Sequence, residues 1–238
     1  MQAQDVPAGD TLSLVHGASL EGEVCGLPLT IAGYLRELAR RHGGAEALVE
    51  WVAGVRIAWT YADLLDRAVE VAAALVADGL GKDGRVGILM TNRLEFLSAL
   101  FGAALAGGVP VPMSTFATPG ELDHMLRASQ VSVLLAERHV AGKDFAAMLE
   151  QLDPAGFPFL RRVVMLADGD GDWARFVSGG ASVPAAQVLA RADTVHPADI
   201  GGIFFSSGTT SLPKGIVHSQ RAFAIQWWRW PRVFGMDR

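Results

Sequence analysis

Residues 85–113 read RVGILMTNRLEFLSALFGAALAGGVPVPM. The mostly apolar run at 85–90 predicts a buried strand, and residues 93–106 carry apolar side chains at helical spacing. Residues 109–113 return to an extended pattern. A strand, a helix and a second strand in close succession are typical of a parallel sheet that is covered by helices on both faces.

The same alternation continues on both sides of this unit. Upstream, Thr30 starts a predicted helix, and Thr60 starts a longer one with the spacing of a capping box. Between them, residues 47–51 and 55–59 predict a hairpin. Downstream, the predicted elements are a helix from Thr118, a strand over 131–135, a helix over 144–152 and a strand over 163–166. After a weakly patterned lead at 1–29, we therefore expect an α/β fold with a mostly parallel sheet covered by helices.

The composition excludes several classes of protein. Of the 238 residues, 50% are apolar and 19% are charged, which excludes an intrinsically disordered chain. The net charge of −5 gives no electrostatic reason to bind nucleic acid, so no such partner is expected. The single cysteine, Cys25, excludes an internal disulfide and a zinc site built from several cysteines. It has no adjacent histidine or lysine to activate it, so an inert thiol is expected.

No stretch of the sequence indicates secretion or a membrane span. A basic region followed by an apolar one is not found near Met1, so no secretory signal is recognised. The uncharged stretch at 96–113 is interrupted by Gly107-Gly108 and by Pro110, and its helical part is too short to span a bilayer. We expect a cytoplasmic protein without a transmembrane segment.

The stretch with the strongest chemical signal is FFSSGTTSLPKG, residues 204–215. An apolar run at 200–205 enters it and residues 215–218 are again extended, so the pattern predicts a loop between two strands. His218 in the second run is expected to be packed or partly exposed rather than catalytic. Glycine lets the backbone approach a polyphosphate, hydroxyl groups add neutral donors, and Lys214 adds a positive charge. The stretch is not a Walker A loop, because its lysine is followed by glycine and not by serine or threonine. On composition alone, a Ser/Thr-rich surface turn is the alternative.

The complete stretch resembles the signature of the adenylate-forming (AMP-binding) superfamily, which includes acyl-CoA synthetases, amino-acid adenylation domains and firefly-type luciferases. That signature runs Ser/Thr-Ser/Thr-Gly-Ser/Thr-Thr-Gly-x-Pro-Lys-Gly, and residues 206–215 fit nine of its ten positions. The departure is Ser211, where the superfamily usually has glycine. Two further stretches, WTYADL at 59–64 and ALAGGVPVP at 104–112, are similar to other elements of the superfamily.

The resemblance implies a two-step reaction. A carboxylate attacks the α-phosphate of ATP, which Mg²⁺ accompanies, to give an acyl-adenylate and pyrophosphate. A thiol, commonly that of coenzyme A, then takes the acyl group. The residues that the resemblance assigns to the nucleotide phosphates are Ser206, Ser207, Gly208, Thr209, Thr210, Ser211, Lys214 and Gly215. It assigns no catalytic residue and no metal ligand in this chain, and an empty loop of this kind is expected to be mobile.

Members of the superfamily are longer than this chain. Their elements for adenine and ribose, most of the carboxylate pocket and a catalytic lysine follow the phosphate loop, and they do not occur in this sequence. The resemblance therefore implies that residues 30–238 are the N-terminal part of the AMP-binding domain of an acyl-CoA ligase, inactive when isolated. Two alternatives stay open: a non-enzymatic module that binds phosphate through the loop, and an amino-acid adenylation domain of an assembly-line enzyme.

Two further features are interpreted as structural. Residues 168–172 carry aspartates at the spacing of a calcium loop, but Trp173 and Gly179 stand where that motif needs glycine and glutamate. Ser219 starts a predicted helix that Pro231 ends. The tryptophans and arginines of this helix predict a core helix in preference to a nucleic-acid or membrane surface.

Overall fold

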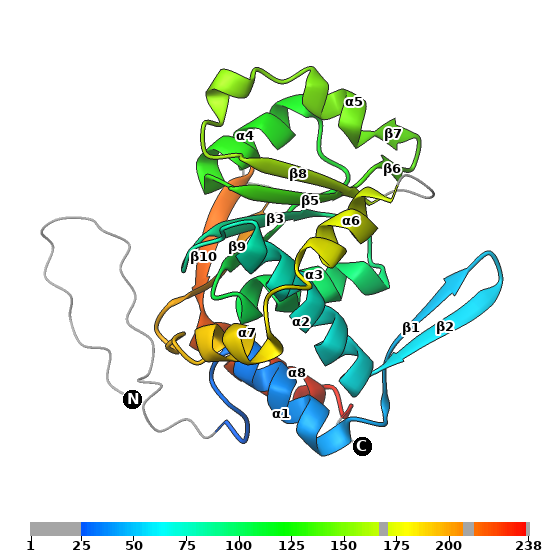
Figure 1. The fold of residues 1–238 in the computed structure, drawn as a ribbon, viewed down its shortest axis with the longest axis vertical. Coiled ribbons are helices and arrows are strands. Elements are labelled where there is room, and N and C mark those ends of the chain that lie inside the picture. Colours follow the sequence, from blue (N-terminus) through cyan, green and yellow to red (C-terminus); the bar gives the residue numbers. More distant parts are fainter. Residues whose placement is uncertain (1–24, 167–170, 207–211, 237–238) are drawn as a thin grey trace, which may run out of the picture.

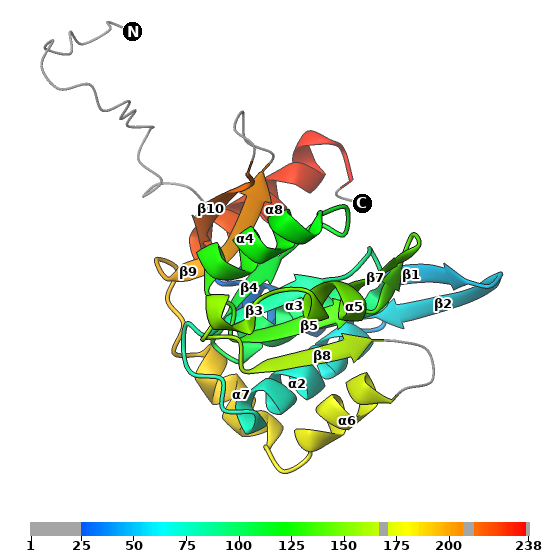
Figure 2. The same ribbon diagram turned by 90° about the horizontal axis from the view of Figure 1, so that it is seen from above.

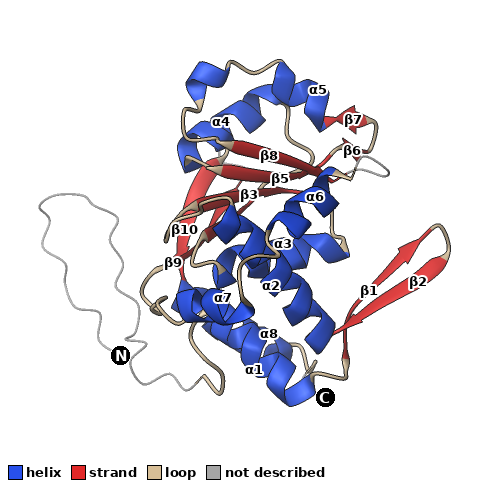
Figure 3. Cartoon of the chain, in the orientation of Figure 1, coloured by secondary structure: helices blue, strands red, loops and turns tan. Residues whose placement is uncertain are grey.

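The fold is built around a parallel sheet. The computed structural model describes residues 25–166, 171–206 and 212–236. In this part of the chain four parallel strands pair in the order β4–β3–β5–β8 (Figures 1 and 3). Their bounds are Arg85–Leu89 for β3, Val109–Pro112 for β4, Val133–Glu137 for β5 and Arg162–Leu166 for β8. The connections from β3 to β4 and from β4 to β5 contain the helices α3 (Leu94–Leu105) and α4 (Pro119–Ser129), as parallel strands require, and the expected α/β fold is confirmed.

The sheet separates two apolar cores. The other helices around it are α1 (Ile31–His42), α2 (Tyr61–Ala77), α5 (Phe145–Glu150), α6 (Asp172–Gly179) and α7 (Ala185–Ala192). Along β5, Val133 and Leu135 lie in one core while Leu134 and Ala136 lie in the other, because successive side chains of a strand face opposite sides. Helices α1, α2, α3, α6 and α7 contribute to the first core, and α4 and α5 to the second (Figure 2). The sequence pattern predicts the elements at the sheet but neither α6 nor α7.

Helices α2 and α3 pack closely because of a glycine between them. A Cβ atom placed on Gly102 of α3 would lie 2.7 Å from Cγ1 of Val71 and 3.0 Å from the carbonyl oxygen of Ala68, both on α2. Real Cβ atoms essentially never come as close to a neighbour as this Cβ would come to Val71, so the glycine sets the separation of the two helices.

The predicted N-terminal elements are confirmed. Strands β1 (Glu46–Val52) and β2 (Val55–Thr60) form an antiparallel hairpin that projects from the body in Figure 1. Its turn, Ala53-Gly54, has φ values of 48° and 81°, and the side chain of Thr30 caps α1. At the start of α2 the carboxylate of Asp63 accepts the backbone N–H of Thr60 at 2.9 Å, which completes the predicted capping box.

The last strands of the chain stand apart from the parallel sheet. Strands β9 (Ile200–Ser206) and β10 (Lys214–Ser219) pair antiparallel with each other, and β9 packs beside β4. Helix α8 (Gln220–Val233) follows with Ser219 as its N-cap. The prediction that Pro231 ends this helix is wrong, since the helix continues to Val233. Proline removes its own N–H donor and constrains the residues before it, so the residues after it can stay helical.

Several short elements lie on the rim of the second core and near the predicted acidic loop. They are β6 (His139–Val140), β7 (Lys143–Asp144) and a 3₁₀ turn at Pro154–Gly156. Residues 167–170 lie outside the described residues, but Asp172 starts α6 and its carboxylate accepts the N–H of Met165 at 2.7 Å. Asp172 therefore joins α6 to the end of β8.

Among the helices that the structure describes, none has the length and apolar character needed to cross a membrane.

Candidate functional site: the strand pair at the phosphate loop

The ladder between β9 and β10 brings three of the predicted site residues together. Lys214 lies directly opposite Ser206, and Gly215 lies opposite Phe205. Ser206, Lys214 and Gly215 are all exposed, so their polar groups face solvent at the open end of the ladder. The other predicted residues, Ser207, Gly208, Thr209, Thr210 and Ser211, lie outside the described residues, as does the expected mobility of the loop. The prediction that the loop joins two strands is confirmed.

Two glycines fix the opposite end of β9. A Cβ atom on Gly201 would lie 2.8 Å from the backbone nitrogen of Gln220, and one on Gly202 would lie 3.2 Å from the carbonyl oxygen of Pro110. The strand is therefore held between α8 on one side and β4 on the other. The next residue, Ile203, is buried in the second core, and from there β9 leads to the exposed Ser206.

A cavity of about 330 Å³ lies beside the end of this ladder. Its lining comes from β9, from the residue just before β10, from α4 and from the segment between β4 and α4. The residues are Ser114, Phe116, Ala117, Glu121, Met125, Phe205, Ser206 and Pro213. The wall combines apolar side chains with three polar residues, Ser114, Glu121 and Ser206. The cavity therefore borders the position at which the phosphate loop begins and ends.

Helix α4 forms the far wall of this cavity and is fixed at its first turn. The Thr118 hydroxyl accepts the N–H of Glu121, and the Glu121 carboxylate accepts the Thr118 backbone N–H at 2.8 Å. The backbone N–H and the hydroxyl of Thr118 both donate to this carboxylate, and these two hydrogen bonds hold the pKa of Glu121 below its usual value. Nearby, the ammonium of Lys143 donates to the carbonyl oxygens of Thr115 and Ala117 at 3.2 and 3.0 Å. The segment between β4 and α4 is thereby tied to β7.

A histidine of α4 contacts the loop exit, and sequence reasoning missed it. The Nε2 atom of His124 lies 2.9 Å from the carbonyl oxygen of Pro213, the residue before Lys214. The two residues are 89 positions apart. Since His124 is part of no motif, a sequence pattern gives no signal for this contact.

Aromatic side chains pack on α8 behind the ladder. The His218 ring lies 5.9 Å from the ring of Phe204 and 5.6 Å from that of Phe223, which confirms that this histidine is packed. Farther along α8, Trp227 packs against Tyr34 of α1 and Phe101 of α3 at 5.5 and 5.7 Å. The prediction of a core helix therefore holds for this face of α8. The C-terminal end of α8 does not follow this prediction, because the Trp230 side chain there is 54% exposed.

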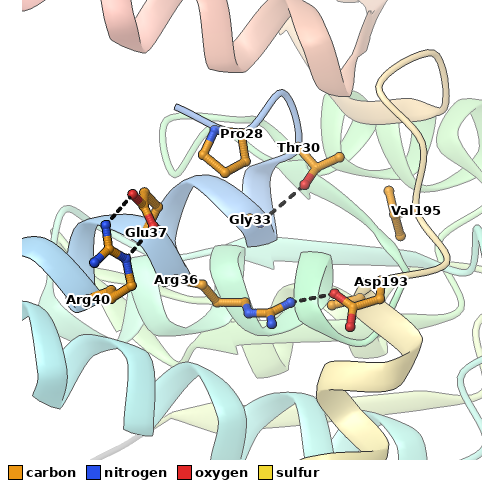
Figure 4. Close-up of a pocket in the computed structure, with 9 residues that line it drawn as sticks. Pro28, Thr30, Gly33, Arg36, Glu37, Arg40, Asp193 and Val195 are labelled. Carbon is orange, nitrogen blue, oxygen red and sulfur yellow. Dashed lines mark hydrogen bonds and ion pairs between the residues drawn. The ribbon is translucent and has the colours of Figure 1, made fainter. Parts of the chain in front are cut away.

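A second cavity, of about 450 Å³, lies between α1 and the segment after α7 (Figure 4). Two arginines line it, and each is paired with a carboxylate: Arg36 with Asp193 at 2.6 Å and Arg40 with Glu37 at 2.8 Å. A phosphate would have to displace these carboxylates. This cavity has no lining residue from β9 or β10, so it is a less suitable site for a nucleotide.

The described residues contain no group of three or more histidine, cysteine, aspartate or glutamate side chains that could hold a metal ion. No residue in this part of the chain is assigned to Mg²⁺.

Comparisons with known proteins identify relatives of the chain. It matches the family model of the AMP-binding enzymes over residues 35–237. It is 37% identical over 166 residues to the 3-[(3aS,4S,7aS)-7a-methyl-1,5-dioxo-octahydro-1H-inden-4-yl]propanoyl:CoA ligase of Mycobacterium tuberculosis, with 68% of this chain and 32% of the relative covered. It is 28% identical over 215 residues to the acyl-CoA ligase sidI of Aspergillus fumigatus, with 87% of this chain and 36% of the relative covered.

The fold agrees with these relatives. A solved structure of a fatty acyl CoA synthetase from Mycobacterium tuberculosis superposes with a TM-score of 0.66 at 25% identity, over 81% of this chain and 35% of that one. The chain thus spans about a third of the length of the proteins that it matches. Since the family model extends over most of the chain, including the strand pair and its loop, the chain belongs to the AMP-binding enzyme family.

Proposed function

We propose that this chain is the phosphate-binding part of an ATP-dependent, AMP-forming carboxylate–CoA ligase. The observation that carries the proposal is the pairing of Ser206 with Lys214 across the open end of the β9–β10 ladder. This pairing places a hydroxyl group and an ammonium group at the two ends of a loop that is rich in serine, threonine and glycine. The names of the relatives, which are CoA ligases, support coenzyme A as the thiol.

The proposed chemistry starts with attack of a substrate carboxylate oxygen on the α-phosphorus of ATP. The bond from that phosphorus to the oxygen that bridges to the β-phosphate breaks, and pyrophosphate leaves with the electron pair. The thiolate of coenzyme A then attacks the acyl carbon, and AMP leaves. Negative charge develops on the departing phosphates in the first step, and groups already aimed at them stabilise the transition state.

In this proposal the residues of the loop hold the β- and γ-phosphates. The ammonium of Lys214 donates to phosphate oxygens, and so do the hydroxyl groups of the loop, which belong to Ser206, Ser207, Thr209, Thr210 and Ser211. Gly208 and Gly215 let the backbone approach the phosphates. Mg²⁺ would arrive with ATP and neutralise phosphate charge.

The isolated 238 residues are proposed to bind ATP weakly and to release no pyrophosphate. Phosphate contacts that are open to water are screened and individually weak. The chain spans about a third of its relatives, and we assign the groups that enclose the nucleotide to the rest of such a ligase. The substrate is proposed to be a carboxylic acid and the compartment to be the cytoplasm.

Pyrophosphate release tests this proposal. It is measured with ATP and coenzyme A, on the 238-residue chain and on the full-length product of its gene. The acids offered include fatty acids and the bicyclic propanoate that is named for the Mycobacterium tuberculosis relative. We expect acid-dependent release from the full-length protein alone. Turnover by the 238 residues would overturn the proposed inactivity, and its absence from the full-length protein would overturn the proposed reaction.

Variants of two lysines then test the site. Lys214→Ala in the full-length protein is expected to slow adenylation by about a hundredfold, because one preorganised donor contributes that much to a developing oxyanion. Lys214→Arg keeps the charge and should retain part of the rate. The matched control is Lys82→Ala, which removes a lysine that pairs with Asp199 at 3.0 Å, next to the other end of β9. Equal losses in the two alanine variants would contradict a specific role for Lys214.

A further inference from the structure

We propose that His124 is a positioning residue, which holds the exit of the phosphate loop through the carbonyl group of Pro213. The proposal rests on the proposed function, because it concerns the geometry of the same phosphate site. It starts from the 2.9 Å contact between Nε2 of His124 and the carbonyl oxygen of Pro213. A carbonyl oxygen only accepts hydrogen bonds, so Nε2 carries a hydrogen and donates a hydrogen bond to the Pro213 oxygen.

Helix α4 gives this histidine a fixed base. The capping box at Thr118 and Glu121 holds the first turn. On the buried face, Leu122, Met125 and Leu126 are each at most 1% exposed and belong to the second core. Ile203 of β9 belongs to the same core, so α4 and the strand that leads into the loop share one packed layer. His124 reaches the loop exit from that layer.

The chemistry of Pro213 makes its carbonyl group the natural point of attachment. Proline has no backbone N–H, so the carbonyl is the one backbone group through which a hydrogen bond can hold this residue. Its ring also fixes φ, so holding the carbonyl limits the remaining backbone freedom at this position. Restricting Pro213 restricts the direction in which the chain enters β10.

The next residue is the lysine of the proposed site. Lys214 pairs with Ser206 in the ladder, so its backbone is held from the β9 side, while Pro213 is held from the α4 side. The loop exit is therefore held by two different elements. With the contact to His124 removed, the ladder alone would fix the end of the loop, and Lys214 would occupy a wider range of positions relative to the phosphates.

Two substitutions of His124 separate this role from simple packing. His124→Leu keeps the side-chain bulk and removes the donor. His124→Gln keeps a donor at a similar distance from the backbone and is expected to rescue the contact. His124→Asn, which is too short to reach Pro213, replaces the leucine variant if that variant does not fold. The matched control is Asp123→Asn, which breaks the pair between Asp123 and Arg127 on the same helix at 2.7 Å and leaves His124 unchanged.

The first measurement is hydrogen exchange on the 238-residue chain, which needs no catalytic activity. In His124→Leu we expect the amides of residues 214–216 to exchange about threefold to tenfold faster, the range expected for losing one net hydrogen bond. The exchange rates of the β5 amides should be unchanged. In His124→Gln the amides of residues 214–216 should exchange at nearly the wild-type rate. Equal exchange in wild type and His124→Leu, or the same acceleration in Asp123→Asn, would overturn the proposal.

The second measurement is pyrophosphate release by the full-length protein. His124→Leu should raise the KM for ATP about threefold to tenfold, in line with the loss of one hydrogen bond, and leave the KM for the acid unchanged. His124→Gln should restore the KM for ATP. An equal rise of both KM values, or no rescue by glutamine, would overturn the positioning role. If the wild type shows no turnover, the proposed function fails, and the exchange experiment still decides whether His124 holds the loop exit.

Discussion

The side-chain oxygen of Gln220 accepts a hydrogen bond from the backbone N–H of Ile31, 2.9 Å away and 189 residues earlier in the chain. Ile31 is the first residue of α1, and the N–H groups of a first helical turn have no partner within the helix. The amide nitrogen of the same glutamine donates to the carbonyl oxygen of Ile200 at 3.2 Å. One side chain, 2% exposed, therefore joins the start of α1, the start of β9 and the start of α8.

Removing this amide should destabilise the protein. Gln220→Leu leaves the Ile31 N–H without its acceptor in a buried position, which costs about 1–3 kcal/mol. The measurement is urea unfolding of the 238-residue chain, followed by tryptophan fluorescence. Gln220→His is the control, because an imidazole can accept at one nitrogen and donate at the other. Stability of the leucine variant equal to that of the wild type would show that the hydrogen bond contributes nothing.

Two glycine-to-alanine substitutions should have opposite effects. Alanine is favoured over glycine in a helix by about 1 kcal/mol. At Gly102 the added methyl group would lie 2.7 Å from Val71, so overpacking should cost about 1–3 kcal/mol and leave a net loss of up to about 2 kcal/mol. At Gly120 of α4 a Cβ would meet nothing within 4 Å, and we expect a gain of about 0.5–1 kcal/mol. Thermal unfolding of both variants gives the comparison, and a stabilised Gly102→Ala protein would contradict the close packing of α2 and α3.

The stability of α1 should depend on pH through Glu37. Hydrogen bonds from Arg40 and Arg41 lower the pKa of its carboxyl from 4.5 to about 2. Because the folded pKa is the lower one, the stabilisation is present above pH 4.5 and is lost as pH falls toward 2. Glu37→Gln should therefore be less stable than the wild type at pH 7, with a difference that shrinks between pH 4.5 and 2. Urea unfolding at several pH values measures this.

High salt is the control for the Glu37 experiment. Since Glu37 and its two arginines lie at the surface, about 1 M salt should screen their attraction. The difference in stability between the wild type and Glu37→Gln at pH 7 should therefore become smaller. A difference that does not change with pH or with salt would mean that Glu37 acts through packing and not through its charge.

Replacing the proline inside α8 should stabilise that helix. Pro231 cannot donate to the carbonyl of the residue four positions earlier, Trp227. Pro231→Ala restores this donor, and near the end of a helix we expect a gain of about 1 kcal/mol together with increased helical circular dichroism. A loss of stability would mean that the conformational restriction of the unfolded chain by proline outweighs the missing hydrogen bond.

The sequence predicts the sheet and its first helices because each of these elements has a local signal. Thr30, Thr60 and Thr118 are capping residues, and β3 to β5 are apolar runs with helical patterns between them. Glycine and proline around Lys214 likewise indicate a turn between two strands. In these places the local propensity and the final packing agree.

Other features depend on contacts between distant parts of the chain, which a local pattern does not contain. Helices α6 and α7 are eight residues each and become helical on a core that other elements provide. The contact of His124 with Pro213 joins residues 89 positions apart and requires the packing of α4 against β9.

The tight packing of Gly201 and Gly202 fixes the base of the β9–β10 pair, at the end of β9 opposite to Ser206. Any tilt of β9 about these glycines displaces Ser206 and Lys214 more than it displaces the glycines themselves. A side chain added at either glycine is therefore expected to misalign the proposed phosphate contacts while leaving every residue of the loop chemically intact. The geometry of the proposed phosphate contacts therefore depends on both ends of β9, and not on the loop residues alone.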